Sequence, residues 1–193
     1  MSRVLVIDDH DPSRKHLVSI LNAGGYEVVG EGTTGATGLA LAAATAPDIT
    51  LMAVGLPDLD GILAARKIMQ AYPHAILLLT SHNDKTTIDR AARAGLMGYL
   101  VKPLRECELR PAIELALARF QEFATLQKEN EDLKKTLGSR KIIERAKGIL
   151  MESRRLTEAD AFALIKRKSM DTRKPMAEIA QAIVLAQEIT RRS

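Results

Sequence analysis

The 193-residue chain has few aromatic residues, a single cysteine and no apolar stretch long enough to cross a membrane. It contains no tryptophan, three tyrosines and three phenylalanines, so aliphatic side chains must form its core. The lone cysteine, Cys107, excludes an internal disulfide and fits a reducing compartment. No apolar run approaches the ~20 residues that span a bilayer, and no basic-then-apolar leader precedes Val4. The composition therefore predicts a cytoplasmic protein without a membrane partner.

Patterns typical of enzymes are also lacking. None of the histidines has the spacing of a metal-binding or catalytic residue, and Cys107 has no sequence context that would activate a nucleophile. An enzyme is therefore the least expected class of protein. The four histidines are His10, His16, His74 and His82.

The first 110 residues or so alternate short β-rich runs with helical patterns. Five such units predict an α/β fold, in which parallel strands joined by helical crossovers form a doubly wound sheet. The expected strands are 3–8, 27–31, 49–53, 75–80 and 97–101, and the expected helices are 12–23, 34–46, 60–71, 84–94 and one that begins at 104.

Polar residues follow three of these strands. Asp8 and Asp9 end the first apolar run, Thr80 ends another and Lys102 follows the last. Functional groups of such sheets gather at the carboxyl ends of the strands. Two carboxylates suit Mg²⁺, but the third strand ends at Ala53, whose methyl group neither binds metal nor accepts a phosphoryl group. We therefore expect a polar pocket that holds at most weak Mg²⁺, at Asp8 and Asp9, and no other cofactor.

The stretch from Pro47 to Gly61 resembles the third strand and following loop of a response-regulator receiver domain. In that family the residue at the position of Ala53 is the phosphorylated aspartate. The resemblance implies a receiver over residues 1–112 with strand order 2-1-3-4-5, and it places Tyr99 at the switch aromatic. It also implies a sensor kinase or a regulatory protein as a partner.

Ala53 changes what such a pocket can do. With two carboxylates in place of three, Lys102 is available to pair directly with Asp8 or Asp9 and to hold the pocket in one state. A natural loss of the carboxylate and an introduced substitution give the same sequence. If the loss is natural, the input is a partner protein, a ligand or abundance. The nearby aspartates, none of which has the register to replace the missing one, are Asp48, Asp58 and Asp60.

A single helical pattern runs from Leu104 to Gly138, and its later part has apolar residues at heptad spacing. An asparagine at an a position costs stability but fixes register and favours two parallel strands. Residues 113–138 therefore predict a coiled coil that forms a homodimer. The alternative is an amphipathic helix that lies against its own domain. The seam residues are Ala116, Phe123, Leu126, Asn130, Leu133 and Leu137.

Residues 139–193 form a basic, helical module. They carry 13 Lys and Arg against 7 Asp and Glu, whereas residues 1–138 carry 15 against 17, so the module favours a polyanionic partner. Three helical patterns are visible, over about 140–152, after the N-cap residue Thr157, and from Pro175. These patterns predict a small three-helix domain.

The segment from Ser139 to Met151 resembles the start of an ANTAR domain, a family named for the AmiR and NasT antiterminators. The resemblance implies a dimeric domain that binds paired hairpins in nascent transcripts and promotes antitermination. The downstream residues that match are Ala161, Phe162, Leu164, Met170 and Ala180, while Ser169 stands where alanine is usual.

Basic side chains of this module would supply phosphate contacts. Gly148 costs a helix about 1 kcal/mol relative to alanine, which predicts that some group, from the protein or from a ligand, approaches the helix closely there. The pattern places Phe162 in the core, so that stacking on bases would fall to arginine. The expected RNA-binding residues are Arg140, Lys141, Arg145, Lys147, Gly148, Arg154, Arg155, Lys166, Arg167, Lys168, Arg173 and Lys174.

Two other functions remain open from the sequence. Three short helices with a basic surface are compatible with a helix-turn-helix DNA-binding module, although the segment from Met170 to Pro175 lacks a tight glycine-bearing turn. The chain could also be a phosphorylation-independent adaptor that binds a partner protein through its receiver.

Overall fold

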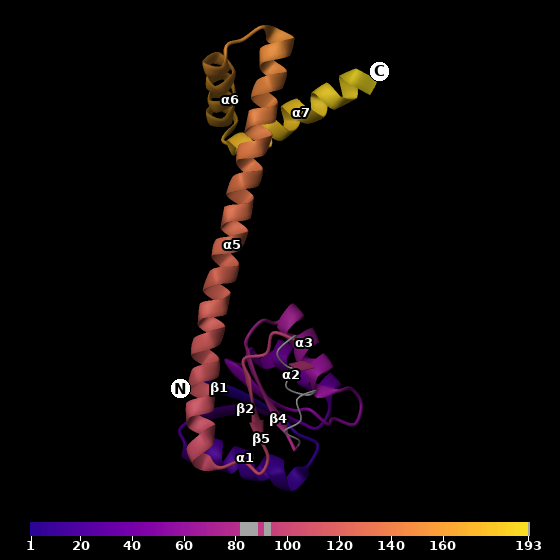
Figure 1. Cartoon of the computed structure of the whole chain (residues 1–193), viewed down its shortest axis with the longest axis vertical. Helices are drawn as coiled ribbons and strands as arrows, with labels where there is room; N and C mark the ends of the chain where they lie inside the picture. The colour runs from indigo at the N-terminus through magenta and orange to yellow at the C-terminus, as the bar shows by residue number, and fades with distance from the viewer. Residues whose placement is uncertain (82–88, 91–93, 193) are drawn as a thin grey trace. The chain divides into compact units, whose positions relative to one another are not determined.

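A computed structural model of the chain describes residues 1–81, 89–90 and 94–192 (Figure 1). The chain forms two compact units, an N-terminal unit, Met1–Ala124, and a C-terminal unit, Thr125–Ser193. Within the described residues, every helix falls short of the length or the apolar character that a membrane span requires.

The N-terminal unit contains the predicted five-stranded parallel sheet, with the strand order β2-β1-β3-β4-β5 that the resemblance to receiver domains implied. The inner strands β3 and β4 are buried at every residue, because helices cover both faces of a doubly wound sheet. The strands are β1 (Arg3–Ile7), β2 (Glu27–Gly32), β3 (Ile49–Ala53), β4 (Ala75–Thr80) and β5 (Gly98–Val101).

Side chains that alternate along the strands build one core on each face of the sheet. On one face, Leu17 and Leu21 of α1 (Asp11–Ala23) and Ile113 of α5 (Glu106–Arg154) pack against the strands. On the other face, α2 (Gly35–Thr45) and α3 (Gly61–Ala71) supply the covering residues. The expected helix at 84–94 lies mostly outside the described residues.

Two carboxylates, those of Asp58 and Asp60, fix the loop between β3 and α3. Asp58 accepts hydrogen bonds from the backbone N–H groups of Gly35 and Ala36, at 2.8 and 2.9 Å, and so caps α2. These hydrogen bonds lower the pKa of Asp58, and the bond from the Ala36 N–H has the largest effect. Asp60 caps α3 and pairs with Arg90 at 2.7 Å. Both aspartates therefore bind groups away from the polar pocket expected at the carboxyl ends of the strands.

Helix α5 runs without interruption from Glu106 to Arg154, so the predicted end at Gly138 is wrong. Glycine weakens a helix by about 1 kcal/mol but keeps its backbone N–H group, so it does not block the i to i−4 hydrogen bond as proline does. The helix therefore belongs to both units, and the first helix expected in the basic module is its last part.

The C-terminal unit consists of the end of α5, α6 (Glu158–Thr172) and α7 (Met176–Arg192). Thr157 is the N-cap of α6, as predicted, and its side-chain oxygen accepts a hydrogen bond from the Asp160 N–H at 3.2 Å. Helix α7 begins directly after Pro175. The small core of this unit consists of Ala146, Leu150, Ala161, Ile165, Ala180 and Val184.

Candidate functional sites

The receiver pocket lies at the carboxyl ends of the strands. It is a cavity of about 620 Å³, and four of the predicted residues, Asp9, Ala53, Thr80 and Lys102, are in its wall. The strand order brings together residues that are far apart in the sequence, as expected for the edge of a doubly wound sheet. The other lining residues are His10, Ser13, Val54, Gly55, Leu79, Ser81 and Pro103.

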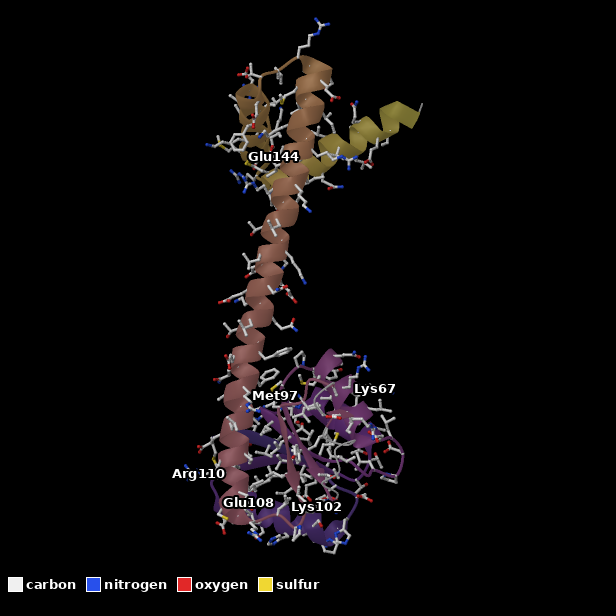
Figure 2. All side chains as sticks on the ribbon, in the orientation of Figure 1. Lys67, Met97, Lys102, Glu108, Arg110 and Glu144 are labelled. Atoms are coloured by element: carbon white, nitrogen blue, oxygen red, sulfur yellow. The ribbon has the colours of Figure 1, made fainter. Side chains whose placement is uncertain are left out.

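An ion pair joins Lys102, which lines the cavity, to Asp8, which is not among its lining residues. The Lys102 Nζ atom lies 2.5 Å from Asp8 Oδ2, and the Asp8 side chain is 1% exposed (Lys102 is labelled in Figure 2). The other carboxylate oxygen, Oδ1, accepts a hydrogen bond from the His10 backbone N–H at 3.1 Å. The direct pairing that the sequence suggested is thus made with Asp8, whereas Asp9 is exposed.

Ala53 lies at the end of β3, where a side-chain oxygen would face the pocket. Ala53 is the last residue of β3 and is 3% exposed, and Thr80, at the end of the neighbouring strand β4, is 5% exposed. Ala53 offers no side-chain oxygen, and both oxygens of Asp8 already have partners. The third carboxylate of a receiver's Mg²⁺ site is therefore absent here, and the Lys102 ammonium group competes with any cation for Asp8.

Tyr99 lies in the middle of β5, where it pairs in register with Leu78. Its side chain is 38% exposed, so the ring is neither buried nor fully in solvent. The predicted switch position is therefore on an accessible strand at one edge of the sheet.

The predicted coiled-coil seam divides into two parts. Ala116 is 1% exposed and belongs to the core of the N-terminal unit, so it is not a seam residue. The first turns of α5 therefore lie against their own domain, as the alternative reading of this helix proposed. The later seam residues are exposed: Phe123 by 41%, Leu126 by 58%, Leu133 by 63% and Leu137 by 59%, with Asn130 exposed among them.

The Lys147 side chain, expected to contact phosphate, is shielded from solvent by two carboxylates that are themselves exposed. Its Nζ atom lies 2.6 Å from Glu158 Oε1 and 2.9 Å from Glu144 Oε2, and its side chain is 8% exposed (Glu144 is labelled on α5 in Figure 2). Hydrogen bonds to Glu158 and then Glu144 raise the pKa of Lys147. The ion pairs of this ammonium group join α5 to α6, because Glu158 is the first residue of α6.

The remaining cations predicted to bind RNA are all exposed. Among them, Arg145 pairs with Glu188 at 2.8 Å and Lys168 pairs with Asp171 at 3.9 Å. The exposed cations are Arg140, Lys141, Arg145, Arg154, Arg155, Lys166, Arg167, Lys168, Arg173 and Lys174.

One prediction about this unit, the burial of Phe162, is wrong, and the close approach expected at Gly148 is not made by the described residues of the chain itself. Within the described residues, nothing outside its own helix and chain neighbours lies within 4 Å of the place where Gly148 would carry a Cβ. Phe162, expected in the core, is 44% exposed. Helix α6 buries Ala161 and Ile165, and Phe162 is turned about 100° from Ala161 around the helix axis. That spacing was visible in the sequence and could have placed Phe162 at the edge of the core.

A 2-1-3-4-5 sheet with acidic and lysine groups at its carboxyl edge, followed by a basic helical unit, defines a response regulator with an N-terminal receiver. The sequence matches the response regulator receiver domain over residues 4–114 and the ANTAR domain over residues 131–184. The chain belongs to the family of response regulators that carry these two domains. It is therefore a regulator with an RNA-binding, antiterminating role.

Relatives support both halves of this assignment. The chain is 41% identical over 182 residues to the transcriptional regulatory protein PdtaR of Mycobacterium tuberculosis, which covers 94% of this chain and 89% of that protein. It is 36% identical over 118 residues to the transcriptional regulatory protein LiaR of Bacillus subtilis, which covers 60% of this chain and 56% of that protein.

Solved structures show the same receiver fold. The signal receiver domain of the response regulator NarL from Mycobacterium tuberculosis is 31% identical with a TM-score of 0.57, and the match covers 60% of this chain and 95% of that one. The receiver domain of a modulated diguanylate cyclase from Desulfovibrio desulfuricans is 30% identical with a TM-score of 0.59, over 63% and 97% of the two chains.

Proposed function

We propose that this regulator works without phosphorylation at the usual receiver position. Ala53 stands at the end of β3, beside the cavity, and has no nucleophilic atom. The Lys102–Asp8 ion pair occupies groups that would otherwise respond to a bound phosphoryl group. Its input is then a sensor kinase or regulatory protein that docks on the receiver without phosphoryl transfer. The protein is a cytoplasmic regulator and not an enzyme.

The proposed output is binding of paired hairpins in nascent transcripts through the C-terminal unit. One observation carries it: the ten cations named above are exposed on a unit that matches the ANTAR domain. Lys147 is left out of the proposed contacts, because its ammonium group is held between two carboxylates. Gly148 contributes an open surface without a side chain, which permits close approach of a backbone.

The output is tested by binding of the purified protein to a two-hairpin RNA and to a DNA duplex of equal charge across a salt series. We expect selective binding of the RNA, with an affinity that falls as salt rises because counterions are released from phosphates. Replacing Arg154 and Arg167 by alanine should reduce the slope of log affinity against log salt concentration by roughly 0.7–0.9 for each lost phosphate contact.

Equal binding to RNA and DNA would show only a polyanion patch and would favour the adaptor function. Preference for the duplex DNA would favour a helix-turn-helix type of output. The matched control is Glu152→Gln, which changes an exposed charge on α5 without removing a cation.

The protein is also proposed to be a homodimer held by the exposed part of the α5 seam. Phe123, Leu126, Leu133 and Leu137 are each more than 40% exposed, although they follow heptad spacing. Burying such a stripe against a second copy removes apolar surface from water, and Asn130 in the same seam specifies two strands.

Replacing Leu126 and Leu133 by glutamate is expected to convert the dimer into a monomer, because charges in the seam repel and remain unpaired. Sedimentation equilibrium measures the change in mass. The control replaces Lys128 and Lys135, exposed residues of the same segment on the side of the helix opposite the seam, by alanine and should leave the dimer intact. A wild-type protein that sediments as a monomer, or a double glutamate variant that remains dimeric, would contradict this proposal.

A further inference from the structure

Helix α6 carries an exposed stripe of three residues, Phe162, Lys166 and Met170, here called the α6 stripe. They are four residues apart, so each is turned about 40° from the previous one and all three lie on one side of the helix. Phe162 is 44% exposed, Met170 is 66% exposed, and Lys166 between them is also exposed. An aromatic ring, a cation and a thioether are thus presented together to solvent.

The exposed ring of Phe162 is not explained by the packing of its own unit. The core of that unit takes Ala161 and Ile165 from α6, and the partly buried apolar residues described around this core do not include Phe162. It is also the only aromatic residue in the last 70 positions of the sequence. A large apolar side chain left at a surface marks a binding site when other features identify its ligand.

We propose that Phe162 stacks on one unpaired base of the bound RNA, while Lys166 contacts the adjoining phosphate and Met170 extends the apolar surface. This inference rests on the proposed RNA-binding function. Proteins that read RNA by sequence bind splayed bases of loops and stack them on aromatic rings. A single aromatic residue provides one stacking position, so it predicts one strongly bound base.

The charges around the stripe favour RNA over a second copy of the chain. Lys166, Arg167 and Lys168 are consecutive and exposed, and Arg173 and Lys174 follow at the end of α6. A second copy of this basic surface would be repelled, whereas phosphates would be attracted.

The acidic residue nearest to Phe162 along this face, Glu158, is neutralised. Glu158 lies four residues before Phe162, and its carboxylate pairs with the Lys147 ammonium group at 2.6 Å. At the other end of the stripe, Asp171 lies 3.9 Å from Lys168. Both acids next to the stripe therefore have a cationic partner from the chain itself, which lowers their repulsion of a nucleic acid.

The test compares Phe162→Ala, Phe162→Leu and Phe162→Trp with wild type, by their affinity for a two-hairpin RNA with unpaired loops and for a fully paired RNA of the same length. Base stacking on an aromatic residue corresponds to roughly a 5- to 150-fold change in affinity. We expect losses in this range for the Ala and Leu variants with the looped RNA only, and near wild-type affinity for the Trp variant.

The chain contains no tryptophan, so Phe162→Trp also places a single fluorescent reporter at the site. Stacking on a base should quench its emission when the looped RNA is added, and the paired RNA should not. The control is Leu185→Ala, which removes another exposed apolar side chain, 54% exposed, from α7 and should leave both affinities unchanged. Circular dichroism confirms that each variant is folded.

Equal affinity of the Leu and Trp variants, without quenching, would overturn the stacking proposal while leaving RNA binding intact. A Phe162→Ala variant that loses self-association and not RNA affinity would assign the stripe to a second copy. Failure of the wild-type protein to bind any RNA would instead overturn the proposed function, and the stacking proposal with it.

Discussion

Replacing Ala53 by aspartate is expected to give a variant that acetyl phosphate phosphorylates in the presence of Mg²⁺, under conditions in which the wild-type protein is expected to stay unmodified. A carboxylate oxygen at this position would attack the phosphorus atom, a new P–O bond would form to the side chain, and acetate would leave with the electrons of the broken bond. Mass spectrometry of the intact protein measures the gain of one phosphoryl group.

The geometry of the pocket supports this outcome. Ala53 ends β3 at the wall of the cavity, and Thr80 and Lys102 line the same cavity. An added carboxylate would supply the missing oxygen ligands for Mg²⁺ together with Asp8 and Asp9, and it would compete with Asp8 for the Lys102 ammonium group.

The matched control is Ala53→Asn, which has nearly the shape of aspartate but no nucleophilic carboxylate. It should stay unmodified. Phosphorylation of the wild-type protein would show that another residue, such as the exposed Asp9, accepts the group, and the proposal of a phosphorylation-independent receiver would fail. An aspartate variant that stays unmodified would mean that the pocket has lost more than one carboxylate.

The sheet and the receiver pocket could be predicted from the sequence because both depend on local signals. Apolar runs that end in Asp8, Thr80 and Lys102 mark the carboxyl ends of strands, and parallel strands place these ends at one edge. The strand order came from the resemblance to receiver domains, and the pairing of the strands confirms it. The partner of Lys102 among the two adjacent aspartates was left open, since it depends on where each side chain points.

The C-terminal unit was harder to predict because its side chains are oriented by contacts between helices. Lys147 has the character of a solvated surface cation, yet its ammonium group is paired with Glu158 of the next helix and its side chain is 8% exposed. Phe162 has the character of a core residue, yet the narrow contact of α6 is filled by Ala161 and Ile165. Similarly, Ala116 fits a heptad but packs against the sheet of its own domain.

Replacing Lys147 by methionine is expected to destabilise the C-terminal unit without removing a phosphate contact. The variant keeps an unbranched apolar stem but leaves Glu144 and Glu158 unpaired and close to each other. Thermal unfolding of the unit should therefore begin at a lower temperature. In contrast, Lys166→Ala should leave unfolding nearly unchanged and should reduce the slope of log affinity against log salt by roughly 0.7–0.9.

The pH dependence of the stability difference between wild type and Lys147→Met shows whether the ion pairs of Lys147 cause it. Pairing with Lys147 lowers the pKa of Glu158 below its usual 4.5, so the stabilisation is present above pH 4.5 and is lost as pH falls below that value. The raised pKa of Lys147 means that the stabilisation is also present below pH 10.5 and is lost as pH rises above it. Wild type and Lys147→Met should thus differ most near neutral pH and converge at both extremes. If the difference in unfolding temperature between wild type and Lys147→Met is independent of pH, Lys147 stabilises the unit by packing of its aliphatic stem. If Lys147→Met and Lys166→Ala lose the same amount of slope of log RNA affinity against log salt, Lys147 is a phosphate contact after all.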